Sequence, residues 1–422
     1  MAQKIAVFIY SDAFCQRHRQ DECNFIRSRK LTFPHLVLFL LNFLKGSADD
    51  ELDGFFNLLQ EEETDQPFVT KSAFTQARKK LKYSAFVELN QVFVDTLYDK
   101  IKPSLWKGFR VCAVDGSTIN LPNNKALREH FQPKGKDNQH PQARASQLYD
   151  VLNHVTIDAL LKPHNIGERA LALQHLQHTH QNDLVLYDRG YPSFELFAQH
   201  RELNRHFCAR SPWNLYNETR DFLNSGKKQQ QVTLTPCSQT KQLCKKQGIS
   251  VQPIKVRLIR VDLDSGEPEV LITSVLSENT ITAVEFKALY HMRWGIEEDY
   301  KRVKCRLEVE QFSGLSVHAV LQDFHAKIFS KNLTALLVNE AQKQVGQNKS
   351  HCKHPYKVNF TRALSKMKDN IIKLLVFSYD YQRFHRVIKW MASFAEAVRP
   401  NRSFERNKKV RPPCSMNNKR TR

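Results

Sequence analysis

Helical periodicity dominates the first hundred residues of the chain and predicts a small helical domain over residues 1–100. Within it, the segment 69–81 offers Thr70 or Ser72 as a helix cap. This helix would turn apolar side chains inward and three cations outward, namely Arg78, Lys79 and Lys82. The pattern is interpreted either as a DNA recognition helix or as the basic, solvated face of a packed helix.

From residue 109 onward the pattern changes to short apolar runs that are typical of buried strands. The run from Phe109 to Val114 ends at Asp115 and a glycine, and the run from Leu184 to Tyr187 ends at Asp188, which Arg and Gly follow. Further strands are predicted at 148–157 and 206–209, and helices at 168–176 and 194–203. Strands that alternate with helices predict an α/β core over residues 105–210 and 285–330.

Apolar and polar residues alternate between residues 211 and 284, which predicts a β-rich subdomain inserted into this core. Residues 331–400 are predicted to form a helical C-terminal region, because residues 317–341 and 370–397 have helical periodicity. Residues 401–422 are rich in Lys and Arg and are predicted to be a mobile tail.

The charge of the chain favours a polyanionic partner. The formal net charge is +21 over 422 residues. Nucleic acid is the first candidate partner, because Lys and Arg side chains that bind its phosphates release condensed counterions and so favour binding. The longest apolar run, Leu36 to Leu44, is about half the roughly 20 residues that a membrane span requires. We therefore expect no membrane contact, a cytoplasmic protein associated with the nucleoid, and cysteines in the reduced state.

A polar row stands out in the segment from Tyr290 to Lys304. At roughly 100° per residue on one α-helix, Tyr290, Arg293, Glu297 and Lys304 share a narrow face. The neighbouring face is apolar, with Leu289, Ile296, Tyr300, Val303 and Leu307. One carboxylate among cations at the rim of a packed helix suits a metal ion that holds a phosphate.

Three acids could belong to such a metal site, namely Asp115, Asp188 and Glu297. The first two are predicted at the ends of buried strands, and the third lies on this helix. Carboxylate oxygens favour Mg²⁺ or Mn²⁺, and two such ions in one site support phosphodiester chemistry. Arg293 and Lys304 would hold neighbouring phosphates, and Tyr290 would donate a hydrogen bond to a phosphate or stack on a base.

These residues carry a resemblance to a known family. Asp115-Gly-Ser-Thr, Tyr187-Asp188-Arg-Gly-Tyr191 and Tyr290-x2-Arg293-x3-Glu297-x6-Lys304 resemble the three acidic motifs of the bacterial cut-and-paste DDE transposases of the insertion sequence four family. The last motif resembles the YREK signature of that family. The resemblance extends over about residues 65 to 400.

The resemblance implies an RNase H-like core in which Asp115, Asp188 and Glu297 bind two divalent ions, with a β-rich insertion before the glutamate helix. It also implies double-stranded DNA as partner, both transposon ends and target, and a homodimer in the DNA-bound complex. The implied reaction is hydrolysis at the ends, hairpin formation by 3′-hydroxyl attack, hairpin opening and strand transfer. By the same resemblance, Tyr290, Arg293 and Lys304 would contact the transferred end of the DNA.

Two other functions remain open at this point. A nuclease on the same core needs the same acids, and a catalytically unused DNA-binding regulator derived from a transposase would keep the fold alone. Trp213 and Trp294 are interpreted as packing residues, and Asp158 as a structural cap.

Overall fold

The computed structural model describes residues 1–27, 29–42, 46–60, 68–132, 140–262, 266–377 and 380–399. The predicted basic tail, residues 401–422, lies outside the described residues. The chain divides into two compact units. The first comprises Met1–Lys100, Ile119–Gln142 and Arg302–Arg422, and the second comprises Ile101–Thr118 and Ala143–Lys301.

Helices make up almost all of the first unit. They are α1 (Ala2–Ile9), α2 (Asp12–His18), α3 (Phe33–Leu41), α4 (Ala48–Gln60), α5 (Lys71–Arg78), α6 (Ser84–Lys100), α7 (Lys125–Phe131), α14 (Val317–Asn348), α15 (Phe360–Val376) and α16 (Tyr381–Ser393). β9 (Tyr356–Val358) and β10 (Ala395–Ala397) form a small two-stranded antiparallel sheet. α14 is 32 residues long and packs against α3, α6, α15 and α16, so it forms the centre of this unit.

Local sequence signals explain where these helices begin. The Thr70 hydroxyl accepts a hydrogen bond from the Ala73 backbone N–H, so Thr70, not Ser72, caps α5. Ser316 caps α14 and Asp380 caps α16 in the same way. Residues 370–397, predicted to be helical in texture, contain parts of two helices: α15 ends at Val376, and the Asp380 cap starts α16.

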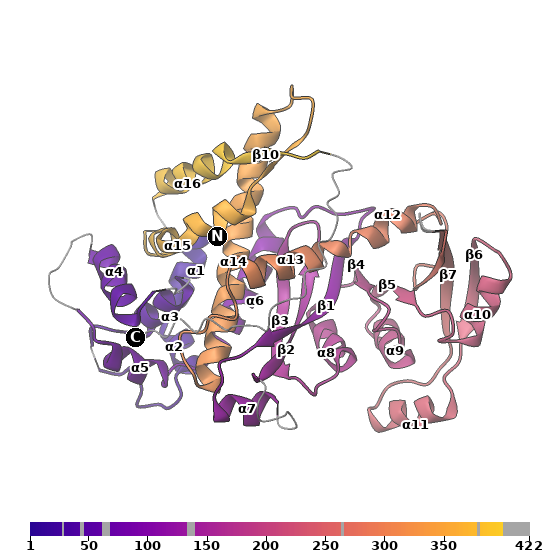
Figure 1. Cartoon of the computed structure of the whole chain (residues 1–422), viewed down its shortest axis with the longest axis horizontal. Coiled ribbons are helices and arrows are strands. Elements are labelled where there is room, and N and C mark those ends of the chain that lie inside the picture. Colours follow the sequence, from indigo (N-terminus) through magenta and orange to yellow (C-terminus); the bar gives the residue numbers. More distant parts are fainter. Residues whose placement is uncertain are drawn as a thin grey trace. The chain divides into compact units, whose positions relative to one another are not determined.

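The second unit is built on an eight-stranded sheet with the strand order β3-β2-β1-β4-β5-β8-β7-β6 (Figure 1). β1, β4 and β5 run parallel, and the other registered pairs are antiparallel. The strands are β1 (Arg110–Asn120), β2 (Gln142–Asp150), β3 (Val155–Pro163), β4 (Asp183–Tyr187), β5 (His206–Ser211), β6 (Gln229–Leu234), β7 (Ile254–Asp262) and β8 (Pro268–Thr273). This arrangement confirms the predicted α/β class.

The helices of the second unit are α8 (Glu168–His175), α9 (Phe194–Glu202), α10 (Asn217–Asn224), α11 (Ser238–Lys246), α12 (Glu285–His291) and most of α13 (Trp294–Cys305), together with the short 3-10 helix η1 (Leu176–His178). α8 and α9 confirm the two helices predicted after the second strand-like segment. β6, β7 and β8 extend the same sheet instead of forming a separate one.

Two strand predictions need correction. The strand predicted for 148–157 is a hairpin, because the Asp150 carboxylate accepts hydrogen bonds from the backbone N–H groups of Leu152 and Asn153 and turns the chain between β2 and β3. The first strand does not end at Asp115 but continues to Asn120, since β1 is bonded to β2 as well as to β4. None of the described helices combines the length and apolar content that crossing a membrane requires.

Candidate functional site

The register of two parallel strands sets the first two acids side by side. β1 pairs with β4 from Arg110 opposite Asp183 to Val114 opposite Tyr187. Asp115 and Asp188 each come directly after this last pair, so a carboxylate follows the paired segment on both neighbouring strands. A buried ion pair between Arg110 and Asp183, with N···O distances of 2.7 and 2.5 Å, fixes this register at the opposite end. The predicted strand end at Asp188 is confirmed.

Asp115 lies in a largely buried environment. Burial raises the pKa of its carboxyl to about 6, although the Gly116 backbone N–H donates a hydrogen bond to Oδ1 at 2.9 Å and Arg293 lowers the pKa. The backbone carbonyl of Asp115 accepts a hydrogen bond from the Tyr300 hydroxyl at 3.0 Å. The side chain and backbone of Asp115 are therefore both held in place.

Asp188 is bound by the first residue of the predicted polar row. The Tyr290 hydroxyl donates a hydrogen bond to Asp188 Oδ1 at 3.1 Å. Burial, together with the charge of Asp188, raises the pKa of Tyr290 above its usual value, so this phenol stays protonated and remains a donor. Tyr290 therefore orients one carboxylate of the candidate site.

The polar row does not lie on one helix, and the prediction of a single helical face is wrong. α12 ends at His291 and α13 begins at Trp294, so Arg293 lies in the turn between them. The backbone hydrogen bonds across this turn connect residues three apart, as in Arg293 N–H to Tyr290 O at 3.1 Å. The adjoining Gly295, a poor helix former, favours this break. The apolar stripe is confirmed, because all five predicted residues are buried.

Arg293 connects the members of the site. Its Nη2 donates to Glu297 Oε1 at 2.8 Å, and its guanidinium lies 5.7 Å from the centre of the Tyr290 ring. Burial by itself lowers the pKa of Arg293, but Tyr290, Asp188 and Glu297 raise it above the usual value. Arg293 is 5% exposed, and within the described part of the chain its Nε–H has no hydrogen-bond partner. The structure thus brings Asp115, Asp188, Tyr290, Arg293 and Glu297 together in one unit.

The remaining predicted cations lie elsewhere. Lys304 is on the last turn of α13, in the part of the chain assigned to the first unit. Lys79 is exposed, and the half-buried Lys82 donates to the backbone carbonyl of Arg17 at 3.4 Å. DNA contacts of Lys304, Lys79 and Lys82 therefore stay predictions.

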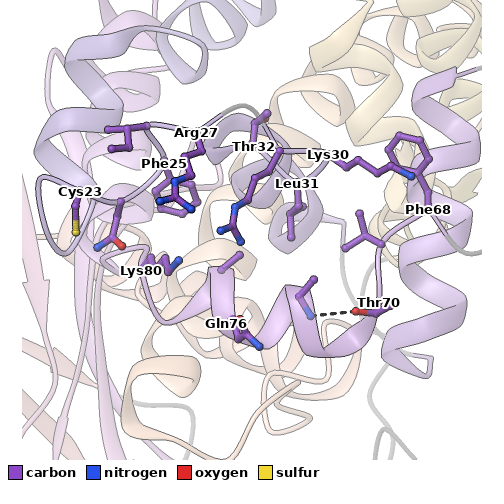
Figure 2. A pocket seen from close by; sticks show the side chains of 16 residues that line it. Cys23, Phe25, Arg27, Lys30, Leu31, Thr32, Phe68, Thr70, Gln76 and Lys80 are labelled. Carbon is purple, nitrogen blue, oxygen red and sulfur yellow. Dashed lines mark hydrogen bonds between the residues drawn. The ribbon is translucent and has the colours of Figure 1, made fainter.

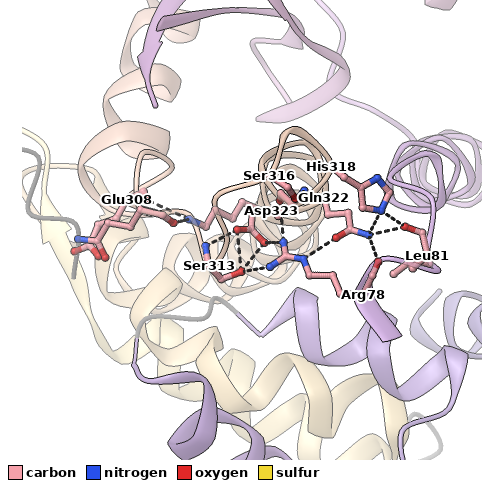
Figure 3. Close-up of polar contacts among 11 residues, drawn as sticks. Arg78, Leu81, Glu308, Ser313, Ser316, His318, Gln322 and Asp323 are labelled. Carbon is pink, nitrogen blue, oxygen red and sulfur yellow. Dashed lines mark hydrogen bonds and ion pairs between the residues drawn. The ribbon is translucent and has the colours of Figure 1, made fainter. Parts of the chain in front are cut away.

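Arg78 does not point outward as predicted. It is 5% exposed, and its guanidinium donates to Ser313, Ala319, Gln322 and Asp323 (Figure 3). The ion pair with Asp323 has an N···O distance of 2.5 Å. The correction has a physical reason: a charge at a buried position of α5 is stable only with such partners.

A buried network behind Asp115 was not predicted from the sequence. His175 Nδ1 lies 2.7 Å from Asp158 Oδ2, its Nε2 lies 2.9 Å from Ser146 Oγ, and Ser146 donates to the Asp115 carbonyl at 3.4 Å. The order Asp, His, Ser resembles a nucleophilic triad, but Ser146 and His175 are fully buried, so the network supports Asp115 and is closed to substrate. The interpretation of Asp158 as a cap misses this role.

Glu168 adds a second contact next to Asp115. A Cβ atom placed on Gly116 would lie 2.9 Å from Glu168 Oε1 and 3.1 Å from its Cγ, and Glu168 forms an ion pair with Arg144. The backbone beside the first acid is therefore covered by a fourth carboxylate. Position 116 has no room for a side chain while Glu168 stays in place.

We expect Gly116→Ala to lower the free energy of unfolding by about 1–2 kcal/mol, because the added methyl group would overlap the Glu168 side chain at its present position. Urea unfolding of the variant measures this loss. The double variant Gly116→Ala/Glu168→Ala should recover most of it, since the clash is then removed. A single variant as stable as the wild type would mean that Glu168 moves without cost.

The two tryptophans that were interpreted as packing residues are exposed. Trp213 is 52% exposed and Trp294 is 44% exposed. Trp294 immediately follows Arg293, and it lies on the first turn of α13 together with Glu297. An indole exposed at this position is a surface on which a base or sugar can stack.

The donor set of the site fits a hard divalent cation. Asp115, Asp188 and Glu297 supply only carboxylate oxygens, which Mg²⁺ and Mn²⁺ prefer, and Asp115 carries the burial cost of a carboxylate that a nearby cation would offset. Within the described ranges, no group of three or more His, Cys, Asp or Glu side chains is arranged so that it could hold a metal ion, and this includes Asp115, Asp188 and Glu297 as they stand. In this structure the cation that bridges part of the site is Arg293.

Comparison with known proteins points in one direction. The family model described as Transposase DDE domain matches residues 106–333. Transposase InsG for insertion sequence element IS4, from Escherichia coli (strain K12), is 27% identical over 249 residues, which cover 58% of this chain and 55% of InsG. Putative transposase InsZ of the same organism is 25% identical over 177 residues, 40% of this chain and 59% of InsZ. The chain thus spans little more than half the length of these relatives.

Among solved structures, the chain is similar to a chain of the piggyBac transposase synaptic complex with hairpin DNA. The alignment covers 97% of this chain and 88% of that chain. The sequence identity is 8% and the TM-score is 0.44.

Proposed function

Because this chain belongs to the family of DDE-domain transposases, we propose that it binds the terminal inverted repeats of an insertion sequence, cleaves the DNA there and joins the 3′ ends to target DNA. The resemblance to the insertion sequence four family is confirmed by the matches to the family model and to InsG and InsZ. One observation carries the proposal: Asp115 and Asp188 directly follow the last registered pair of the parallel strands β1 and β4, and Arg293 donates a hydrogen bond to Glu297 in the same unit.

The chain's own side chains prepare the site for phosphodiester chemistry. The Gly116 N–H orients Asp115, the Tyr290 hydroxyl orients Asp188, and the Arg293 guanidinium orients Glu297. These three carboxylates would hold two Mg²⁺ or Mn²⁺ ions, and the chemistry that such ions supply when bound is stabilisation of charge on the attacking and leaving oxygens.

The proposed reaction proceeds by phosphoryl transfers. Water attacks a phosphorus atom at the end of the element, and the P–O bond to the 3′ oxygen breaks. The freed 3′ hydroxyl then attacks the opposite strand and forms a hairpin, which a second water opens. The same 3′ hydroxyl finally attacks target DNA, so each step exchanges one P–O bond for another. Trp294, exposed beside Arg293, is placed to stack on an unpaired base at the end.

The proposed architecture assigns these tasks to segments of the chain. Residues 105–210 and 285–330 would form an RNase H-like core and residues 211–284 its insertion, while residues 1–100 would bind DNA. Residues 331–400 would complete the helical part. We further propose a homodimer in the DNA-bound complex and an intracellular location at the nucleoid.

A direct test incubates the protein with a labelled fragment that carries the inverted repeats flanking its coding region, together with Mg²⁺. We expect 3′ nicks, hairpins and joined products on a gel. Nicks without joined products would favour the nuclease, and binding without any cleavage would favour the DNA-binding regulator. Either result would overturn the transposase proposal.

We expect Lys304→Ala to weaken complexes with the transposon ends, because an ammonium group in the last turn of α13 would contact a phosphate. Removing one phosphate contact reduces the slope of log K against log salt by about 0.9. Fluorescence anisotropy at several salt concentrations measures this slope. An unchanged slope would remove Lys304 from the proposed DNA contacts, and Lys301→Ala on the same helix serves as control.

A further inference from the structure

The first unit contains a pocket that the transposition chemistry does not use. It has a volume of about 830 Å³ and lies between the loop residues 23–27 and 29–32 and one side of α5 (Figure 2). Phe25 and Leu31 line it from the loop, and Val69 and Phe68 from the segment that precedes α5.

The pocket is strongly cationic. Arg27, Arg29 and Lys30 line it from the loop, and Lys80 lines it just beyond the end of α5. None of its sixteen lining residues is an Asp or Glu. In the described part of the chain the charged groups of Arg27, Arg29 and Lys80 have no acidic partner, and the Lys30 ammonium lies 4.2 Å from the centre of the Phe68 ring. Among the described lining residues, four cations thus face no acidic side chain, which favours a positive potential in the pocket.

The helical wall of the pocket is suited to a polar ligand. Thr70, Ala73, Gln76, Ala77 and Lys80 line it at helical spacing, so one face of α5 and its extension points toward the pocket. Phe74 and Arg78 are buried on the other side of the same helix. The face of α5 that is open to a ligand is therefore not the one that the sequence pattern predicted.

We propose that this pocket binds the phosphodiester backbone of duplex DNA. The inference rests on the proposed function and names a contact surface for its DNA. Arg27, Arg29 and Lys30 are exposed and only Lys80 is half-buried, so most of the charge is at the rim, within reach of a rigid duplex. A site for a small anion would instead enclose its cations. Guanidinium groups at the rim also match phosphate geometry.

Salt dependence of binding tests the charge contacts. We expect the triple variant Arg27→Ala/Arg29→Ala/Lys30→Ala to bind duplex DNA at least tenfold more weakly. The slope of log K against log salt should fall by about 0.9 for each lost phosphate contact. The matched control, Lys125→Ala/Lys343→Ala/Lys349→Ala, removes the same net charge from exposed lysines outside the pocket. Equal losses in both triple variants would overturn the proposal.

Cys23 gives a direct reading of occupancy, because this exposed free thiol lines the pocket. We expect duplex DNA to slow alkylation of Cys23 by N-ethylmaleimide at least fivefold, as followed by peptide mass spectrometry, and the pocket variant to lose this protection. Protection by inorganic phosphate or a mononucleotide, but not by duplex, would overturn DNA as the occupant. No protection by any of these would overturn the site itself.

The two proposals fail in different ways. If wild-type protein cleaves and joins transposon ends while the pocket variant binds DNA normally, the pocket inference is wrong and the proposed function stands. If duplex DNA protects Cys23 from alkylation but the protein never cleaves transposon ends, the pocket inference stands and the catalytic proposal is wrong.

Discussion

Glu297→Gln should reduce cleavage of the transposon ends by at least ~10³-fold, while the fold and the affinity for DNA stay close to wild type. Glutamine keeps the size of the side chain and can still accept a hydrogen bond from Arg293. It removes the negative charge with which the site would bind a divalent cation. Loss of about 4 kcal/mol of transition-state stabilisation corresponds to this change in rate. The initial rate of 3′ nicking with Mg²⁺ measures it.

The neighbouring glutamate provides a matched control for this experiment. Glu298 has a 55% exposed side chain and forms an ion pair with Lys301 on the surface of α13. Glu298→Gln makes the same change of charge one residue along the helix, and we expect cleavage within about twofold of wild type because exposed ion pairs contribute little. Normal cleavage by Glu297→Gln, or an equal loss in both variants, would contradict the assignment of Glu297.

The acids of the site could be predicted from the sequence because their signals are local. An apolar run that stops at an acid and a glycine indicates a buried strand, and Asp188 follows such a strand directly. The register that sets Asp115 beside Asp188 is not local, since it depends on the pairing of β1 with β4. The sequence therefore proposes which acids form the candidate site, whereas their arrangement is visible only in the structure.

The prediction for the polar row failed because helical periodicity does not show a short break. Tyr290 and Glu297 are at helical spacing, yet α12 and α13 are separate helices with Arg293 in the turn. Across the turn, backbone hydrogen bonds connect residues three apart, which winds the chain more tightly than an α-helix does. As a result, Arg293 is buried among the acids instead of standing on the rim.

The supporting contacts could not be predicted, because they join residues far apart in the sequence. His175 and Ser146 are 29 positions apart, and Arg78 and Asp323 are 245 positions apart. A histidine or an arginine in isolation carries no pattern that identifies its partner. The same limit explains why an exposed cationic pocket was missed while Arg78, a buried cation, was predicted to contact DNA.

We expect Arg78→Ala to lower the free energy of unfolding of the helical unit by about 3–5 kcal/mol, the usual cost of leaving one member of a buried ion pair without its partner. Asp323 would lose its 2.5 Å partner, and the Ala319 carbonyl and the Gln322 amide oxygen would lose their donors (Figure 3). Urea unfolding followed by far-UV circular dichroism measures the loss, because helices dominate this unit.

Lys79→Ala, one residue along and exposed, should stay within about 0.5 kcal/mol of wild type. The paired variant Arg78→Met/Asp323→Leu should recover much of the stability lost in Arg78→Ala, since a buried ion pair can often be replaced by apolar side chains of similar volume. The same proteins separate structure from DNA contact. If Arg78→Ala unfolds like wild type but binds DNA with a smaller salt slope, Arg78 contacts phosphate after all. If it is destabilised and the paired variant binds DNA normally, Arg78 anchors α5 to α14 and makes no contact with phosphate.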